Sequence, residues 1–161
     1  MKKALIILAA VFCIAAVASA QPKALGGRIG NYGLDISYEN YVGSGSDFLE
    51  FELGLDEAFS TNSFHFDGVY NIMIAHPDWS ASGQWGFYAG PGASVAVWGR
   101  RREVLDDNIV YAGILGNVGL EYIFDFPLQI SMSLRPRLMF GDGKVRDSGL
   151  LSLGLGVRYV F

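Results

Sequence analysis

The sequence predicts an all-β fold in which eight antiparallel strands close into an up-and-down barrel. Three observations predict it. Apolar and polar residues alternate with period two over most of the chain, as in strands whose two faces meet different surroundings. Seven segments rich in Gly, Pro, Asn, Asp and Ser separate the alternating runs. After the first 20 residues, no stretch keeps a helical period.

Residues 1–20 are expected to form a secretory signal peptide outside the fold. A positive Lys2-Lys3 pair precedes an unbroken apolar stretch over 4–17, and Ala18-Ser19-Ala20 forms a small-x-small cleavage site. This order of segments is typical of export signals, and the apolar stretch is short for a membrane-spanning helix. We expect cleavage after Ala20.

The expected barrel domain covers residues 21–161 and is acidic. Removing two of the 12 basic residues leaves 10 against 16 acids, a formal charge of −6. This balance argues against nucleic-acid binding, which needs a basic surface. Cys13 lies within the signal, so no disulfide or cysteine metal site is expected. Lys23 and Lys144 are the only lysines left, whereas a water-facing surface normally carries many.

Each predicted strand follows from its own alternation. Leu34, Ile36 and Tyr38 alternate with Asp35, Ser37 and Glu39, and the final strand alternates leucines with Ser152, Gly154, Gly156 and Arg158. The predicted strands are 23–31, 33–42, 48–58, 63–75, 83–99, 109–124, 128–140 and 150–161. Pro91 and Pro136 fall in mid-strand, where proline removes a ladder hydrogen bond, so a bulge or kink is expected at each.

The polar faces predict an inverted barrel with its apolar side in a membrane. They hold glycine, serine, carboxylates and arginine, which suit the narrow, filled interior of eight strands. The expected internal polar network comprises Arg28, Asp35, Glu39, Glu50, Glu52, Asp67, Glu121, Arg135, Arg137 and Arg158. Aromatic residues near strand ends suggest interfacial girdles, and they are Tyr41, Phe48, Phe59, Trp98, Phe124, Phe126, Phe140, Tyr159 and Phe161. Closure follows because a sheet in lipid cannot leave an edge unpaired.

Three segments resemble a known group of proteins. Leu155-Gly-Val-Arg-Tyr-Val-Phe161 is similar to the C-terminal signal that the outer-membrane barrel-assembly machinery reads, with Tyr159 and Phe161 as its aromatic positions. The stretches 119–136 and 87–93 resemble small outer-membrane β-barrel proteins of Bacteroidota, which share the eight-stranded plan of the OmpA transmembrane domain and OmpX. The resemblance implies a Gram-negative outer-membrane protein that contacts lipid and lipopolysaccharide.

Candidate chemistry is sparse. Ser63, His65 and Asp67 share a strand face, but residues two apart lie about 6.5–7 Å from each other along a strand, too far for a triad. We interpret the histidine as part of the internal network. Arg100, Arg101 and Arg102 open a predicted external loop and are a candidate lipopolysaccharide contact, against the alternative of a loop neutralised by its own acids. His76-Pro-Asp78 lacks a third metal ligand.

We therefore predict a monomeric, non-enzymatic outer-membrane barrel, without cofactor or metal, that has a structural or surface-interaction role. Two alternatives share the fold: a narrow porin-like channel and a lipid A-modifying membrane enzyme. A third alternative reverses the two faces and gives a soluble periplasmic barrel that binds lipid.

Overall fold

The computed structural model describes residues 23–31, 33–42, 46–56, 63–99, 108–141, 144–146 and 152–161. Its strands are β1 (Lys23–Gly30), β2 (Gly33–Tyr41), β3 (Phe48–Asp56), β4 (Ser63–Ala75), β5 (Gln84–Gly99), β6 (Asn108–Ile123), β7 (Leu128–Arg135), β8 (Arg137–Gly141), β9 (Lys144–Arg146) and β10 (Ser152–Val160). Among the described residues, no helix is long and apolar enough to cross a membrane. The predicted signal peptide lies outside the described residues.

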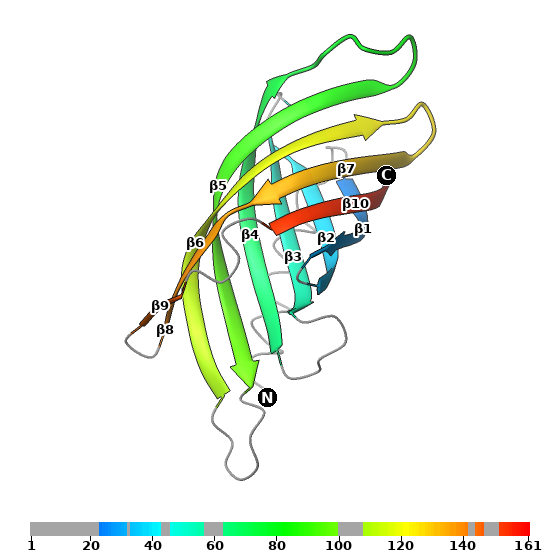
Figure 1. Ribbon diagram of the computed structural model, residues 1–161. Helices are drawn as coiled ribbons and strands as arrows, with labels where there is room; N and C mark the ends of the chain where they lie inside the picture. Colours follow the sequence, from blue (N-terminus) through cyan, green and yellow to red (C-terminus); the bar gives the residue numbers. More distant parts are fainter. Residues whose placement is uncertain are drawn as a thin grey trace.

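The strands form a closed antiparallel barrel, as the sequence predicts (Figure 1). The sheet order is β5-β4-β3-β2-β1-β10-β7-β6, and β5 also pairs with β6, which closes the ring. β7 and β8 both pair with β6 in one register, from Val118↔Leu134 to Leu115↔Arg137, so they act as a single barrel strand. The barrel therefore has eight strands, with β9 added as a short neighbour of β8.

The two mid-strand prolines act differently. Pro136 interrupts its strand and separates β7 from β8, while its carbonyl still accepts a hydrogen bond from Gly116 N at 3.0 Å. β5 continues through Pro91, which keeps its partner Gly116 on β6. The expected distortion at Pro91 is limited to the β4 side, where the pairing is interrupted because proline has no N–H to donate. A register shift on β4 lies elsewhere, between Met73 and Ala75.

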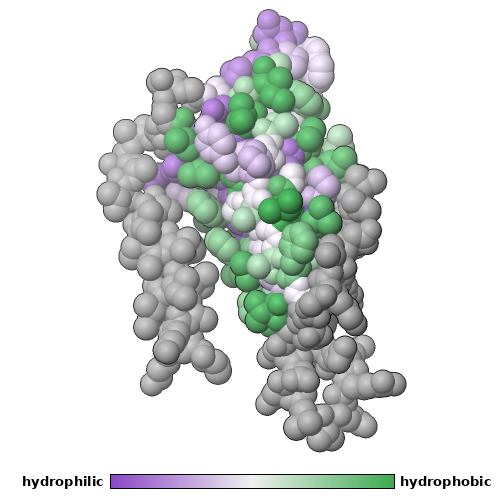
Figure 2. All heavy atoms as spheres, turned by 90° about the vertical axis from the view of Figure 1, so that its left-hand side faces the viewer, coloured by the Kyte–Doolittle hydropathy of each residue, from purple (hydrophilic) through white to green (hydrophobic). Residues whose placement is uncertain are grey.

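The alternation of side chains separates an outer from an inner face. On β10, Leu153, Leu155 and Val157 are exposed, whereas Arg158 is buried. The same alternation holds on β2 and β7. Figure 2 shows apolar side chains over the outer surface, with hydrophilic residues gathered at the end that carries the β4–β5 turn.

One end of the barrel holds the beginning of β1 and the end of β10, and we call it the terminal rim. There the backbones of Lys23 and Phe161 exchange hydrogen bonds of 3.0 and 2.8 Å. The β2–β3, β4–β5 and β6–β7 connections reach the same rim. β1, β2, β3 and β10 have 8 or 9 residues, whereas β5 and β6 have 16 each. The wall on the β5–β6 side is consequently the longer one (Figure 1).

The predicted aromatic girdle needs a correction at two positions. Tyr41 and Phe48 lie inside the barrel, 8% and 0% exposed, and pack with Tyr88 in an inner cluster. Side chains two residues apart on a strand point to the same face. Tyr41 lies two residues from Glu39 and Phe48 two residues from Glu50, so both share the inner face with these glutamates. Phe59 and the Trp98 side chain lie outside the described parts of the structure. Phe126, Phe140, Tyr159 and Phe161 are exposed, and Phe124 is partly exposed.

Candidate functional site

The barrel interior gathers all ten charged residues that the sequence assigns to a polar network. Each of them is buried, with at most 9% of its surface exposed. They come from β1, β2, β3, β4, β6, β7, β8 and β10, and the closed sheet turns them toward one lumen. Buried charge is costly unless it is paired, so the pairing of these groups decides what the interior can do.

Arg135 of β7 spans the lumen. Its guanidinium contacts the Glu50 carboxylate at 2.6 Å, also pairs with Glu52, and donates from Nε to Asn117 Oδ1 at 3.0 Å. β3 and β7 lie four steps apart in the eight-stranded ring, and therefore on opposite walls. Arg135 thus ties together strands that share no backbone hydrogen bonds.

Arg158 of β10 makes a second cross-lumen connection. Its Nε donates to Ser37 Oγ at 2.8 Å and lies 3.1 Å from Glu39 Oε1, and its Nη1 donates to Ser131 Oγ at 2.7 Å. The remaining nitrogen pairs with Glu50. Glu50 is consequently the hub of the network, since its two oxygens serve both arginines.

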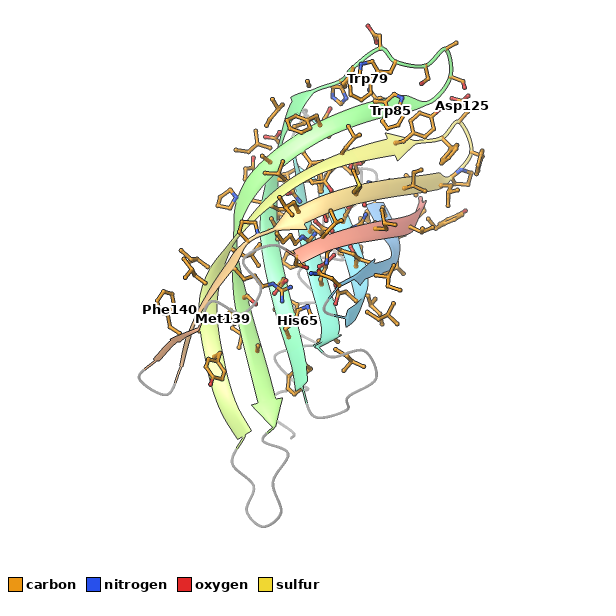
Figure 3. All side chains as sticks on the ribbon, viewed as in Figure 1. His65, Trp79, Trp85, Asp125, Met139 and Phe140 are labelled. Carbon is orange, nitrogen blue, oxygen red and sulfur yellow. The ribbon has the colours of Figure 1, made fainter. Side chains whose placement is uncertain are left out.

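A second group of charges lies toward the far end of the lumen. Arg28 contacts Asp35 at 3.2 Å, and Arg137 pairs with Asp67. His65 Nε2 lies 3.3 Å from Asp35 and 4.0 Å from Asp67. His65 lies in the middle of the barrel in Figure 3. Its neighbours therefore include two carboxylates of the network.

Small residues opposite the large ones make this filling sterically feasible. A side chain at Gly154 would overlap the Arg28 guanidinium, and one at Gly119 would overlap the ring of Tyr88. Glycine is therefore required at these points of the inner face because neighbouring side chains occupy its space.

Two apolar clusters line the interior beyond the charges. Tyr41, Phe48 and Tyr88 form an aromatic cluster, in which the Phe48 ring centroid lies 5.5 Å from that of Tyr41 and 5.0 Å from that of Tyr88. A second cluster joins Ala96, Tyr111 and Met139. Neither cluster was predicted from the sequence. The predicted network named only charged residues. Its neutral partners share the strand face of those residues, and they are Ser37, Asn71, Asn117, Gln129, Ser131 and Ser133.

An outer aromatic chain lies at the terminal rim (Figure 3). Successive contacts join Trp79, Trp85, Tyr122, Phe124 and Phe126, with centroid distances of 5.5, 4.7, 4.7 and 4.8 Å. At the end of β10, the rings of Tyr159 and Phe161 stack with their centroids 6.3 Å apart. Aromatic side chains of this kind favour the boundary between hydrocarbon and water.

The other sequence predictions have different outcomes. The arginines at 100–102 lie outside the described residues. Within the part of the chain that the structure describes, no three His, Cys, Asp or Glu side chains group as metal ligands. His76 contacts the Trp85 carbonyl at 3.1 Å and Ser46 Oγ at 3.0 Å, so it holds the β4–β5 turn.

Comparisons with protein-family models, curated proteins and solved structures gave no match to this chain.

Proposed function

We propose that this protein is an integral outer-membrane β-barrel with a structural or surface-interaction role, whose interior is held shut by side chains. The observation that carries the proposal is the distribution of polarity. Arg135 and Arg158 are 0% and 1% exposed, whereas Ile36 and Ile114 on the outer wall are 63% and 60% exposed. A water-soluble barrel has the opposite arrangement, and a membrane barrel has this one.

The extent of the outer apolar surface supports a lipid environment. Exposed large apolar residues occur on each of the eight barrel strands that the structure describes. Contiguous apolar patches beyond a few hundred Å² are rare on soluble monomers. Transfer from water to an apolar medium contributes about 1.5–3 kcal/mol for each large side chain that it covers fully. Lipid is the covering that suits an apolar wall on every side.

The cross-lumen ties support a closed interior rather than an open pore. Arg135 and Arg158 reach from one wall to carboxylates on other strands, so their side chains occupy the lumen. A narrow channel is the second candidate, and the excess of buried carboxylates over arginines favours cations in it. Single-channel recording in planar bilayers separates the two, because a closed barrel gives no conductance steps. The lipid A-modifying enzyme stays an untested alternative, which release of acyl chains from labelled lipid A would reveal.

The decisive experiment is fractionation followed by electrophoresis with and without boiling. If the protein is exported, assembled by the barrel-assembly machinery and inserted as a monomer, it should sediment with outer membranes. The unboiled protein should also migrate faster in the gel than the boiled protein. A protein that remains in the soluble periplasmic fraction, with the same mobility in both samples, contradicts the proposal.

Tryptophan fluorescence gives an independent test in lipid vesicles. Variants that keep only Trp79 or only Trp85 report on the terminal rim. Lipids brominated near the headgroup should quench them more strongly than lipids brominated near the bilayer centre, because the rim aromatics are expected at the interface. Equal and negligible quenching by both lipids would show that the barrel does not insert.

A further inference from the structure

Two buried carboxylates face each other near the terminal rim. Glu39 comes from β2 and Glu121 from β6, four steps apart in the ring. Gln129 lies between them, since its Nε2 donates to Glu121 Oε2 at 2.8 Å and its side chain also interacts with Glu39. The two glutamates interact electrostatically and are both almost fully buried. Two ionised carboxylates in this arrangement repel each other, unless one of them takes up a proton or a positive charge lies close by.

The arginines do not supply that charge fully. Glu39 shares Arg158 with Glu50. Among the described residues, no basic side chain lies within ion-pair distance of Glu121; Arg158 acts on it only at longer range. The buried acids are Asp35, Glu39, Glu50, Glu52, Asp67 and Glu121, and the buried arginines are Arg28, Arg135, Arg137 and Arg158. Six acids against four arginines leave a formal charge of −2 in the described interior when His65 is neutral.

Several buried oxygen atoms without a hydrogen-bond partner belong to side chains around this pair. The hydroxyls of Tyr41 and Tyr88 are buried and have no hydrogen-bond partner among the described residues, and neither has Gln129 Oε1. Tyr41 is close enough to Glu121 and Glu39 to be affected by their charges, and Tyr88 to Glu50, Glu39 and Glu121. The end of the Tyr88 ring lies over Gly119, two residues before Glu121 on the inner face of β6. Buried polar groups without partners are rare in folded proteins and call for a ligand or ordered water.

We propose that Glu39, Glu121, Tyr41, Tyr88 and Gln129 form a site for one calcium ion inside the terminal rim. The donors are all oxygen atoms, which hard cations prefer over nitrogen or sulfur. Ca²⁺ accepts irregular sets of carboxylate, amide and other oxygen ligands, whereas Mg²⁺ demands a nearly ideal octahedron. A charge of +2 also balances the formal excess of acid. Only two of the donors are carboxylates, so we expect a dissociation constant of about 10⁻⁴ to 10⁻³ M, as in extracellular calcium modules.

The test uses the full mature chain, folded in a zwitterionic detergent that contributes no anionic calcium sites. Urea unfolding is followed with CaCl₂, with MgCl₂ and without divalent ions, at constant ionic strength. At a Ca²⁺ concentration ten times its dissociation constant, the folded-to-unfolded ratio should rise about 11-fold. Tb³⁺, a luminescent substitute for Ca²⁺, should give emission sensitised by the adjacent tyrosines, and CaCl₂ should suppress it.

Two variants locate the site. Glu121→Gln should abolish the response to Ca²⁺, and Tyr88→Phe, which removes one oxygen and keeps the ring, should weaken binding several-fold. The matched control is Asp78→Asn, which removes a carboxylate from the exposed β4–β5 turn and should leave the response unchanged.

An equal calcium response in Glu121→Gln and the unaltered protein would show adventitious surface binding and overturn the proposal. The proposal would also be overturned if neither protein responded to Ca²⁺ and Glu121→Gln were the more stable of the two. The Glu39–Glu121 pair would then need no cation. The site depends on the barrel fold and not on where the barrel resides. A failure of this test therefore leaves the proposed outer-membrane role standing, and the reverse also holds.

Discussion

The inner and outer faces of the barrel wall use the same strands in opposite ways. Within β10, the Arg158 guanidinium contacts Ser37, Glu39, Glu50 and Ser131. The next residue, Tyr159, is 58% exposed on the outer surface. The inner face depends on directed polar contacts between particular atoms, whereas the outer face requires only apolar character. The two faces should therefore differ sharply in which substitutions they tolerate.

The largest effect is expected from Arg135→Met, which keeps an unbranched side chain but removes the guanidinium and its charge. Glu50 and Glu52 would lose their contacts with Arg135 inside the lumen. Breaking a buried ion pair from one side costs about 3–5 kcal/mol. Urea unfolding in lipid vesicles measures the loss. The control is Met132→Leu on the outer face of the same strand, and equal stability of the two variants would contradict the structural role of the network.

A slightly smaller effect is expected from Leu155→Arg on the outer face of β10, where the leucine is 56% exposed. An arginine at the bilayer midplane destabilises a barrel by about 2–4 kcal/mol. Leu155→Val keeps the apolar character and should cost far less. Both variants are compared by urea unfolding in vesicles. Unchanged stability of Leu155→Arg would indicate that this face meets water.

Gly154→Val tests the steric requirement of the inner face. The new side chain overlaps the Arg28 guanidinium, and overpacking of this kind costs about 1–3 kcal/mol. The matched control is Gly27→Ala, whose new methyl group would meet little beyond the Asp35 carbonyl at 3.4 Å. Thermal unfolding of the two variants gives the comparison. A lower midpoint for Gly27→Ala than for Gly154→Val would reverse the assignment of the faces.

The smallest effect is expected at the terminal rim, from Trp79→Ala. This change removes one ring contact, with Trp85, and such pairs contribute about 0.5–1.5 kcal/mol. The control is Ser82→Ala, which removes an exposed hydroxyl from the same turn and keeps the backbone carbonyl that accepts from Tyr122. Unfolding in vesicles should show a modest loss for the tryptophan variant alone. A loss as large as that of Arg135→Met would show that the outer rim is as specific as the interior.

The strands and the two faces could be predicted from the sequence because both are local properties. A period of two and a turn signal are visible within ten residues, and the predicted strands match the observed ones apart from the division at Pro136 and the short β9. The girdle assignment failed at Tyr41 and Phe48 because nearness to a strand end was given more weight than parity. β5 continues through Pro91, whereas Pro136 interrupts its strand. This difference depended on the neighbouring strands, which the sequence does not specify.

The sequence by itself determined which residues share a face, since adjacent side chains of a strand must point in opposite directions. It also determined that charges of both signs lie on one face. Only the tertiary structure decided that Arg135 meets Glu50 and Glu52 across the lumen, and that Glu39 faces Glu121. These contacts depend on the closure of the barrel and on the register between its strands. Residues more than 80 positions apart, such as Arg135 and Glu52, come together only when the ring has closed at a particular stagger.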